Sequence, residues 1–155
     1  SNGNKQFPPG RDVPALAGIY AKTYGAFYDE NWYRKAIMGS YIFSADRCFI
    51  VEHGGKPVAT VLAWEDEKKK DIGRGVLYYL ATDPAHQHRG LGKACTAAVM
   101  SYFKKDGRRE VQIITADFRV NALRAYLGLG FETVEDTCEM KTRWANVREA
   151  LDSQG

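Results

Sequence analysis

Apolar residues recur at helical spacing over the first forty residues of the chain. Asp12 is a candidate N-cap, and Pro14 falls in the first turn, where proline is tolerated. The spacing of the apolar positions that follow predicts a helix over about residues 13–24, and a second, shorter helix is predicted from near Asp29 to Gly39. This region is dense in aromatic residues: Tyr20, Tyr24, Phe27, Tyr28, Trp32 and Tyr33.

The pattern then changes to runs of β-branched and aromatic residues that are typical of strands. Residues 48–52 and 57–64 flank a turn at residues 53–56, which predicts a hairpin. Residues 76–81 are apolar at every position, as expected for a central strand that is covered on both faces.

After residue 81, helices and strands alternate. The spacing predicts a helix from Leu91 to about Asp106, a strand over residues 111–115 and a helix over residues 120–129. Two closing strands are predicted at residues 131–134 and 137–144, followed by a short helix. This order predicts an α/β fold, a mixed sheet with helices on its faces, in a single domain over residues 1–155. Residues 1–3, which lack an initiator methionine, are expected to be a tag remnant.

Composition and charge narrow the function classes. The chain has 155 residues, of which 45% are hydrophobic and 26% charged, as in an ordinary globular domain. The net charge of +3 is too small and too dispersed to favour nucleic-acid binding. No apolar run approaches the roughly 20 residues of a membrane span, and the start lacks a signal-peptide pattern. The three cysteines are far apart, which argues against a zinc site and a disulfide framework, so we predict a cytoplasmic protein.

The segment from Leu80 to Lys93 carries the candidate chemistry, because a central strand leads through a glycine turn directly into a helix. Unpaired N–H groups and the positive end of the helix dipole would converge there, which favours an anion such as phosphate. Gly90 and Gly92 would let the backbone approach that anion, while nearby cationic side chains add charge. The alternative is a turn that merely joins strand to helix. Neither the Walker pattern nor the Rossmann fingerprint is present.

Two motifs resemble those of the GCN5-related N-acetyltransferase (GNAT) superfamily. Residues 87–92, with the sequence Gln-His-Arg-Gly-Leu-Gly, are similar to its Gln/Arg-x-x-Gly-x-Gly/Ala signature, whose loop binds the pyrophosphate of acetyl-coenzyme A. Residues 121–131 are similar to its second motif, a helix that ends in Tyr-x-x-x-Gly-Phe, here with Tyr126 and Phe131. The motifs occur in the expected order, and the surrounding pattern agrees from about residue 10 to residue 144.

The resemblance implies a GNAT fold whose central sheet contains a splayed strand pair that separates after residue 111, with acetyl-coenzyme A as co-substrate and no metal. The main chain of Leu80, Ala81 and Thr82 would bind the pantetheine arm as an added strand. Relatives usually carry an Asn where this chain has Asp117-Phe118-Arg119. Arg119 could therefore contact the phosphates or pair with Asp117. Besides these three strand residues, the implied coenzyme-binding site comprises Gln87, His88, Arg89, Gly90, Leu91, Gly92, Lys93, Arg119, Asn121 and Tyr126.

The implied activity is transfer of an acetyl group to a primary amine by direct attack in a ternary complex, with Tyr126 as the general acid. Many relatives use a carboxylate as base where this chain has Val76, which leaves Glu65, Tyr78 or ordered water as alternatives. We expect a small-molecule acceptor, contacted by Tyr28, Trp32 and Tyr78, and the resemblance allows a homodimer. The competing hypotheses are a non-catalytic acyl-coenzyme A-binding sensor or partner-binding module, and a phosphate-loop nucleotide binder.

Overall fold

A computed structural model of the chain describes residues 3–6, 12–66, 73–115 and 119–153. These residues form two compact units, one within Ser1–Ile114 and the other within Thr115–Gly155. In these ranges, no helix combines the length and the apolar character that a membrane span requires.

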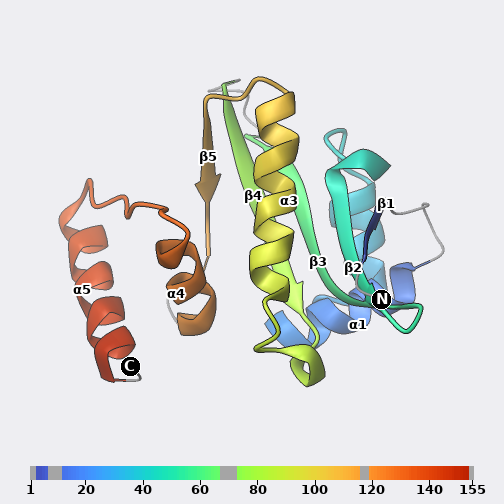
Figure 1. The fold of residues 1–155 in the computed structure, drawn as a ribbon, viewed down its shortest axis with the longest axis horizontal. Helices are drawn as coiled ribbons and strands as arrows, with labels where there is room; N and C mark the ends of the chain where they lie inside the picture. Colours follow the sequence, from blue (N-terminus) through green and yellow to red (C-terminus); the bar gives the residue numbers. More distant parts are fainter. Residues whose placement is uncertain (1–2, 7–11, 67–72, 116–118, 154–155) are drawn as a thin grey trace. The chain divides into compact units, whose positions relative to one another are not determined.

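The first unit is built on a five-stranded mixed sheet whose strands lie in sequence order (Figure 1). The first three pairings are antiparallel, and the last one, between β4 and β5, is parallel. The predicted hairpin and central strand are thus confirmed. The first strand was not predicted, because its Gly-Asn-Lys-Gln sequence shows no apolar alternation. The strands are β1 (Gly3–Gln6), β2 (Cys48–His53), β3 (Lys56–Glu65), β4 (Arg74–Thr82) and β5 (Glu110–Ile113).

Two helices cover the sheet, α3 (Leu91–Lys105) on one face and α1 (Val13–Tyr24) on the other (Figure 1). Both helices were predicted. Phe103 of α3 is buried against Gly75 of β4, where an added Cβ would lie 2.6 Å from the ring. This close approach explains why a glycine occupies this position of the strand.

The second predicted helix is present as α2 (Glu30–Trp32) followed by a π-helical turn, η1 (Tyr33–Met38). It begins at Asp29, whose carboxylate accepts a hydrogen bond of 2.9 Å from the backbone N–H of Trp32. It ends at Gly39, where a Cβ would collide with the carbonyl oxygen of Lys35. Two short 3₁₀ turns, η2 (Ala45–Arg47) and η3 (Pro84–His86), complete this unit as described.

The second unit contains α4 (Val120–Gly128), as predicted, and α5 (Cys138–Ser153). The two predicted closing strands are wrong: residues 131–136 have no regular structure, and residues 138–144 begin α5. The apolar positions in this region, Met140, Trp144, Val147 and Leu151, are spaced four, three and four apart, which is a helical period. Thr137 supports the helix start, since its hydroxyl accepts a 3.1 Å hydrogen bond from the N–H of Met140.

Candidate active site

The pairing between β4 and β5 stops before β4 does. It runs from Arg74 opposite Glu110 to Leu77 opposite Ile113, while β4 continues to Thr82 alongside β3. The two parallel strands therefore separate two residues later than predicted. We call residues 74–77 the closed end of β4 and residues 78–82 its open end.

A β-bulge at Tyr79 lies at the start of the open end. Tyr78 faces Leu62 and Ala81 faces Thr60, so two residues of β4, Tyr79 and Leu80, lie opposite one residue of β3. Tyr79 has a φ of 49°, in the left-handed region that side chains rarely adopt, at a cost of about 1–3 kcal/mol. Nothing in the alternation of this strand marks the bulge, so the sequence analysis missed it.

Aromatic side chains gather around the bulge. Ring centroids lie 4.3 Å apart for Tyr78 and Tyr79, 5.1 Å for Trp32 and Tyr79, and 4.8 Å for Tyr28 and Trp32. Tyr24, at the end of α1, also contacts Tyr79, with centroids 5.5 Å apart. All five side chains are half-buried. We call them the aromatic cluster; it brings together the three predicted acceptor residues and adds Tyr24 and Tyr79, whose only sequence signal was the local density of aromatic residues.

The ionisation of Tyr79 is suppressed in this cluster. Burial, reinforced by the adjacent Tyr78, raises the pKa of the Tyr79 hydroxyl well above its ordinary value. Tyr79 therefore stays protonated at neutral pH and is unsuited to act as a base.

After β4 ends at Thr82, a glycine turn leads into α3. His88 and Gly90 have φ angles of 64° and 76°, and Gly90 caps the helix. The first hydrogen bond described within this helix runs from the N–H of Ala94 to the carbonyl of Gly90. The N–H groups of Leu91, Gly92 and Lys93 come before it, in the first turn, where a helix has no carbonyl of its own to accept from them.

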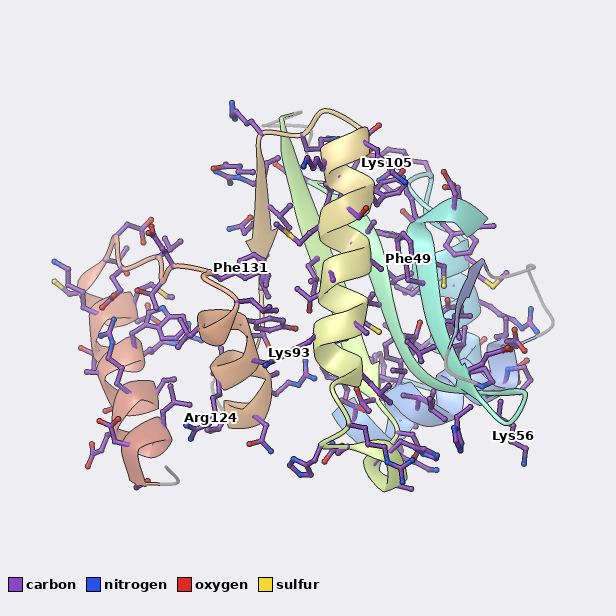
Figure 2. All side chains as sticks on the ribbon, in the orientation of Figure 1. Phe49, Lys56, Lys93, Lys105, Arg124 and Phe131 are labelled. Atoms are coloured by element: carbon purple, nitrogen blue, oxygen red, sulfur yellow. The ribbon has the colours of Figure 1, made fainter. Side chains whose placement is uncertain are left out.

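This helix terminus adjoins the open end of β4. A Cβ added at Gly92 would lie 3.9 Å from the Leu80 side chain. Figure 2 shows Lys93 in the first turn of α3, where its side chain is exposed, like that of Arg89. The structure thus brings the predicted strand and loop residues of the coenzyme site together.

Asp83 fixes the turn to its surroundings. Its N–H donates a 2.8 Å hydrogen bond to the carbonyl of Val58, and its carboxylate lies 3.6 Å from the Lys22 ammonium and 3.2 Å from Nδ1 of His86. Although desolvation acts in the opposite direction, hydrogen bonds from the Ala85 backbone and His86 hold the pKa of Asp83 below its ordinary value. The turn is therefore anchored to β3 and α1 before any ligand binds.

Glu65, the candidate base, is the last residue of β3 and lies opposite the closed end of β4. It faces Gly75, five residues from Leu80, or about 16 Å along an extended strand. Its carboxylate accepts a 2.9 Å hydrogen bond from Arg108 and lies 3.7 Å from the Arg47 guanidinium. These contacts favour a structural role for Glu65 and give no support to the prediction that it acts as a base.

The remaining predicted residues belong to the second unit. Arg119 precedes α4, Asn121 is exposed in its first turn, and Tyr126 is buried with its ring 6.2 Å from that of Phe131. The N–H of Phe131 donates a 3.2 Å hydrogen bond to the carbonyl of Tyr126, which closes the end of the second motif. Asp117 lies outside the described residues, so its pairing with Arg119, like the catalytic role of Tyr126, stays a prediction.

Sequence comparisons identify the family of the chain. The sequence model of the Acetyltransferase (GNAT) family matches residues 13–131, which include both motifs. An uncharacterised N-acetyltransferase of Methanocaldococcus jannaschii is 29% identical over 134 residues, which cover 80% of this chain and 58% of that protein. A mycothiol acetyltransferase of Actinosynnema mirum is 29% identical over 133 residues, covering 82% and 43%. The chain thus spans about half the length of these curated relatives.

Solved structures share the fold. The aminoglycoside N-acetyltransferase AAC(6')-Iy, in complex with a bisubstrate analogue that joins coenzyme A to an acetylneamine, superposes with a TM-score of 0.70. The match covers 88% of this chain and 95% of that one, at 17% sequence identity. At that identity the likeness shows the common fold, a mixed sheet flanked by helices.

Proposed function

Because this chain belongs to the GNAT family of acetyltransferases, we propose that it transfers an acetyl group from acetyl-coenzyme A to the primary amine of a small molecule. The observation that carries this proposal is the construction of β4. Its open end outruns β5, carries a bulge and leads through a glycine turn to the first N–H groups of α3. A long, thin ligand with an anionic diphosphate matches that combination of a strand and a helix terminus.

The residues at the turn fit coenzyme A. The glycine at position 90 permits the left-handed backbone that turns the chain into α3, and there is open space where its Cβ would be, with no atom of another described residue within 4 Å. In the proposal, the N–H groups from His88 to Lys93 bind the pyrophosphate, and Arg89 and Lys93 add charge from exposed positions. The main chain of Leu80, Ala81 and Thr82 binds the pantetheine arm. Gln87, Arg119 and Asn121 remain proposed contacts on the strength of the family motifs.

The proposed chemistry needs no acyl-enzyme. A neutral amine attacks the thioester carbonyl, forming a C–N bond and a tetrahedral intermediate, which then collapses by breaking the C–S bond. The departing thiolate takes a proton from the Tyr126 hydroxyl, and the nitrogen releases its surplus proton to water. Tyr126 then regains a proton from water, which closes the cycle. At neutral pH most of a primary amine is protonated, so the reaction draws on the small neutral fraction. We assign no side chain as base, since Glu65 is held by two arginines.

The aromatic cluster supports a small-molecule acceptor. Tyr28, Trp32 and Tyr78 present half-buried rings beside the open end, a surface suited to a flat or apolar group, or to an amine that first binds as a cation. This assignment rests on the neighbourhood of the rings and β4, which is the strand proposed to carry the thioester.

The decisive experiment is an acceptor screen that follows the release of free thiol from acetyl-coenzyme A. Diamines, aryl-alkyl amines, amino sugars and a peptide with a free N-terminus form the panel, and acetyl-coenzyme A and ATP are titrated separately by calorimetry. We expect acetyl-coenzyme A to bind, ATP not to bind, and at least one small amine to be acetylated. If acetyl-coenzyme A binds but no amine releases thiol, the non-catalytic binding module replaces the proposal. Binding of ATP instead favours the nucleotide binder.

The role of Tyr126 is tested in the same assay. Tyr126→Phe keeps the ring but removes the proposed proton donor, so we expect kcat to fall by about 100-fold. The dissociation constant for acetyl-coenzyme A, measured by calorimetry, should change less than about twofold, because the groups proposed to bind the pyrophosphate and the pantetheine arm are kept. An unchanged kcat in the folded variant would remove Tyr126 from the mechanism.

A further inference from the structure

Tyr24 links α1 to the bulge in β4. Its hydroxyl donates a 2.7 Å hydrogen bond to the carbonyl oxygen of Leu80, 56 residues away in the chain. Leu80 directly follows Tyr79, the residue with a φ of 49°, and is 5% exposed. The hydrogen bond is thus made to the backbone of the bulge itself, at a buried position where a missing donor is costly.

The Tyr24 ring is held on several sides, which directs its hydroxyl. It meets the Tyr79 ring edge to face at an interplanar angle of 89°, and its centroid lies 5.5 Å from that of Tyr28 and 6.2 Å from that of Tyr20. It is also the last residue of α1, where the N–H of Gly25 donates to Ala21 and closes the helix. Few rotations of the side chain would keep these contacts, so the phenol is a fixed donor to β4.

The hydrogen bond from Tyr24 reaches β4 where the strand has lost its pairing with β5. Leu80 lies three residues beyond Leu77, the last β4 residue paired with β5, within the open end. In that stretch, the order of the backbone depends on β3 and on contacts from the helices. A bulge that holds a residue in a strained conformation persists only where its surroundings fix it, and the Tyr24 hydroxyl is one group that does so.

We propose that Tyr24 is a positioning residue for acetyl transfer: by holding the Leu80 carbonyl it fixes the bulge, and so fixes the direction of the β4 amides beside the thioester. Tyr24 acts through β4 and exchanges no proton with the reactants. The inference rests on the proposed function, because it concerns the geometry of the same strand. Its contribution should therefore be seen in turnover more than in coenzyme binding, since the helix terminus that would hold the pyrophosphate is untouched by the change.

The test is Tyr24→Phe, which keeps the ring and removes only the hydroxyl. Misplacement of a reacting group by about 1 Å can cost up to about 100-fold in rate, so we expect kcat to fall by about 10- to 100-fold. The KM and the dissociation constant for acetyl-coenzyme A should change less than about twofold. Hydrogen exchange at the Leu80 and Ala81 amides should become faster, while exchange in β2 stays unchanged.

The matched control is Tyr20→Phe. Tyr20 lies one turn earlier on α1 and its ring also contacts that of Tyr79, but within the described residues its buried hydroxyl makes no hydrogen bond to β4. Its kcat should therefore stay within about twofold of the wild type. Thermal unfolding of both variants verifies the fold.

The outcomes separate the two proposals. A wild type that acetylates an amine, together with a folded Tyr24→Phe variant of equal kcat, overturns the role of Tyr24 and leaves the proposed function intact. A wild type that acetylates none of the amines overturns both. If Tyr24→Phe loses its cooperative unfolding transition, Tyr24→Leu and Tyr24→Met are measured. A cooperative variant of either kind with wild-type kcat also overturns the inference.

Discussion

The closed and open ends of β4 belong to one strand but have different neighbours in the sheet. At the closed end, β4 has a partner strand on each side, and ion pairs surround it: Arg74 lies 2.7 Å from Glu110, and Glu65 is shared by Arg108 and Arg47. At the open end, β4 is no longer paired with β5, Tyr79 forms a bulge with aromatic rings packed around it, and a glycine turn follows the strand.

We propose that this difference decides where the coenzyme binds. A strand with a paired neighbour on each side has already committed its backbone groups, whereas a strand that outruns its neighbour offers an edge to an extended ligand. The charged residues follow the same division: the carboxylate of Glu65 forms ion pairs at the closed end, while the exposed Arg89 and Lys93 flank the start of α3, which adjoins the open end. In our proposal, the closed end of β4 contributes to stability and the open end to acetyl transfer.

The largest effect is expected from a β-branched residue in the glycine turn. Gly90→Val forces a side chain into the left-handed region, so the turn must rearrange and misdirect its N–H groups. Loss of two such hydrogen bonds to an anion corresponds to a rise of about 100-fold in the dissociation constant for acetyl-coenzyme A, measured by calorimetry.

Gly107→Val is the matched control for that variant. Gly107 follows the opposite end of α3 and has a φ of 75°, against 76° for Gly90. As at Gly90, no atom of the residues that the structure describes lies within 4 Å of the place where a Cβ would be. We expect a lower melting temperature with unchanged coenzyme affinity. Equal loss of affinity in both variants would mean that general destabilisation, and not the turn, weakens binding.

A smaller effect is expected at the aromatic cluster. Replacing Tyr28 and Trp32 together by alanine removes two rings that we assign to the acceptor, which corresponds to an increase of about 10-fold in the KM of the acceptor amine. The KM of acetyl-coenzyme A should stay within about twofold. The assignment fails if the folded double variant keeps the wild-type KM for the amine, as it would if both rings served only the core.

The smallest effect on turnover is expected at the closed end. Glu65→Gln weakens a charged hydrogen bond to Arg108, so the free energy of unfolding should fall by about 1–3 kcal/mol while kcat changes less than about twofold. Urea unfolding and the thiol-release assay measure the two quantities. A kcat reduced by more than about 10-fold at full stability would instead identify Glu65 as the base.

Local patterns predicted most of the first unit. The periodicity of residues 13–24 and 91–105, and the glycines at 54 and 55, act over a few residues and predicted α1, α3 and the hairpin that the structure confirms. The family motifs likewise placed Gly90 and Gly92 at the start of a helix.

Features set by distant contacts escaped prediction. The bulge depends on packing between Tyr79 and side chains of α1, some sixty residues earlier in the chain, and no glycine marks it. The start of α5 was mistaken for a strand because apolar residues are sparse over residues 131–144. The helical spacing becomes clear only when Val147 and Leu151 are included.

The division of β4 into two ends is tested most directly by hydrogen exchange with and without acetyl-coenzyme A. Our account predicts that the coenzyme slows exchange at residues 78–82 and at Leu91, Gly92 and Lys93, and leaves residues 74–77 unchanged, because those amides already lie within a sheet. Protection confined to residues 74–77, or no protection of the open end at saturating coenzyme, would contradict it.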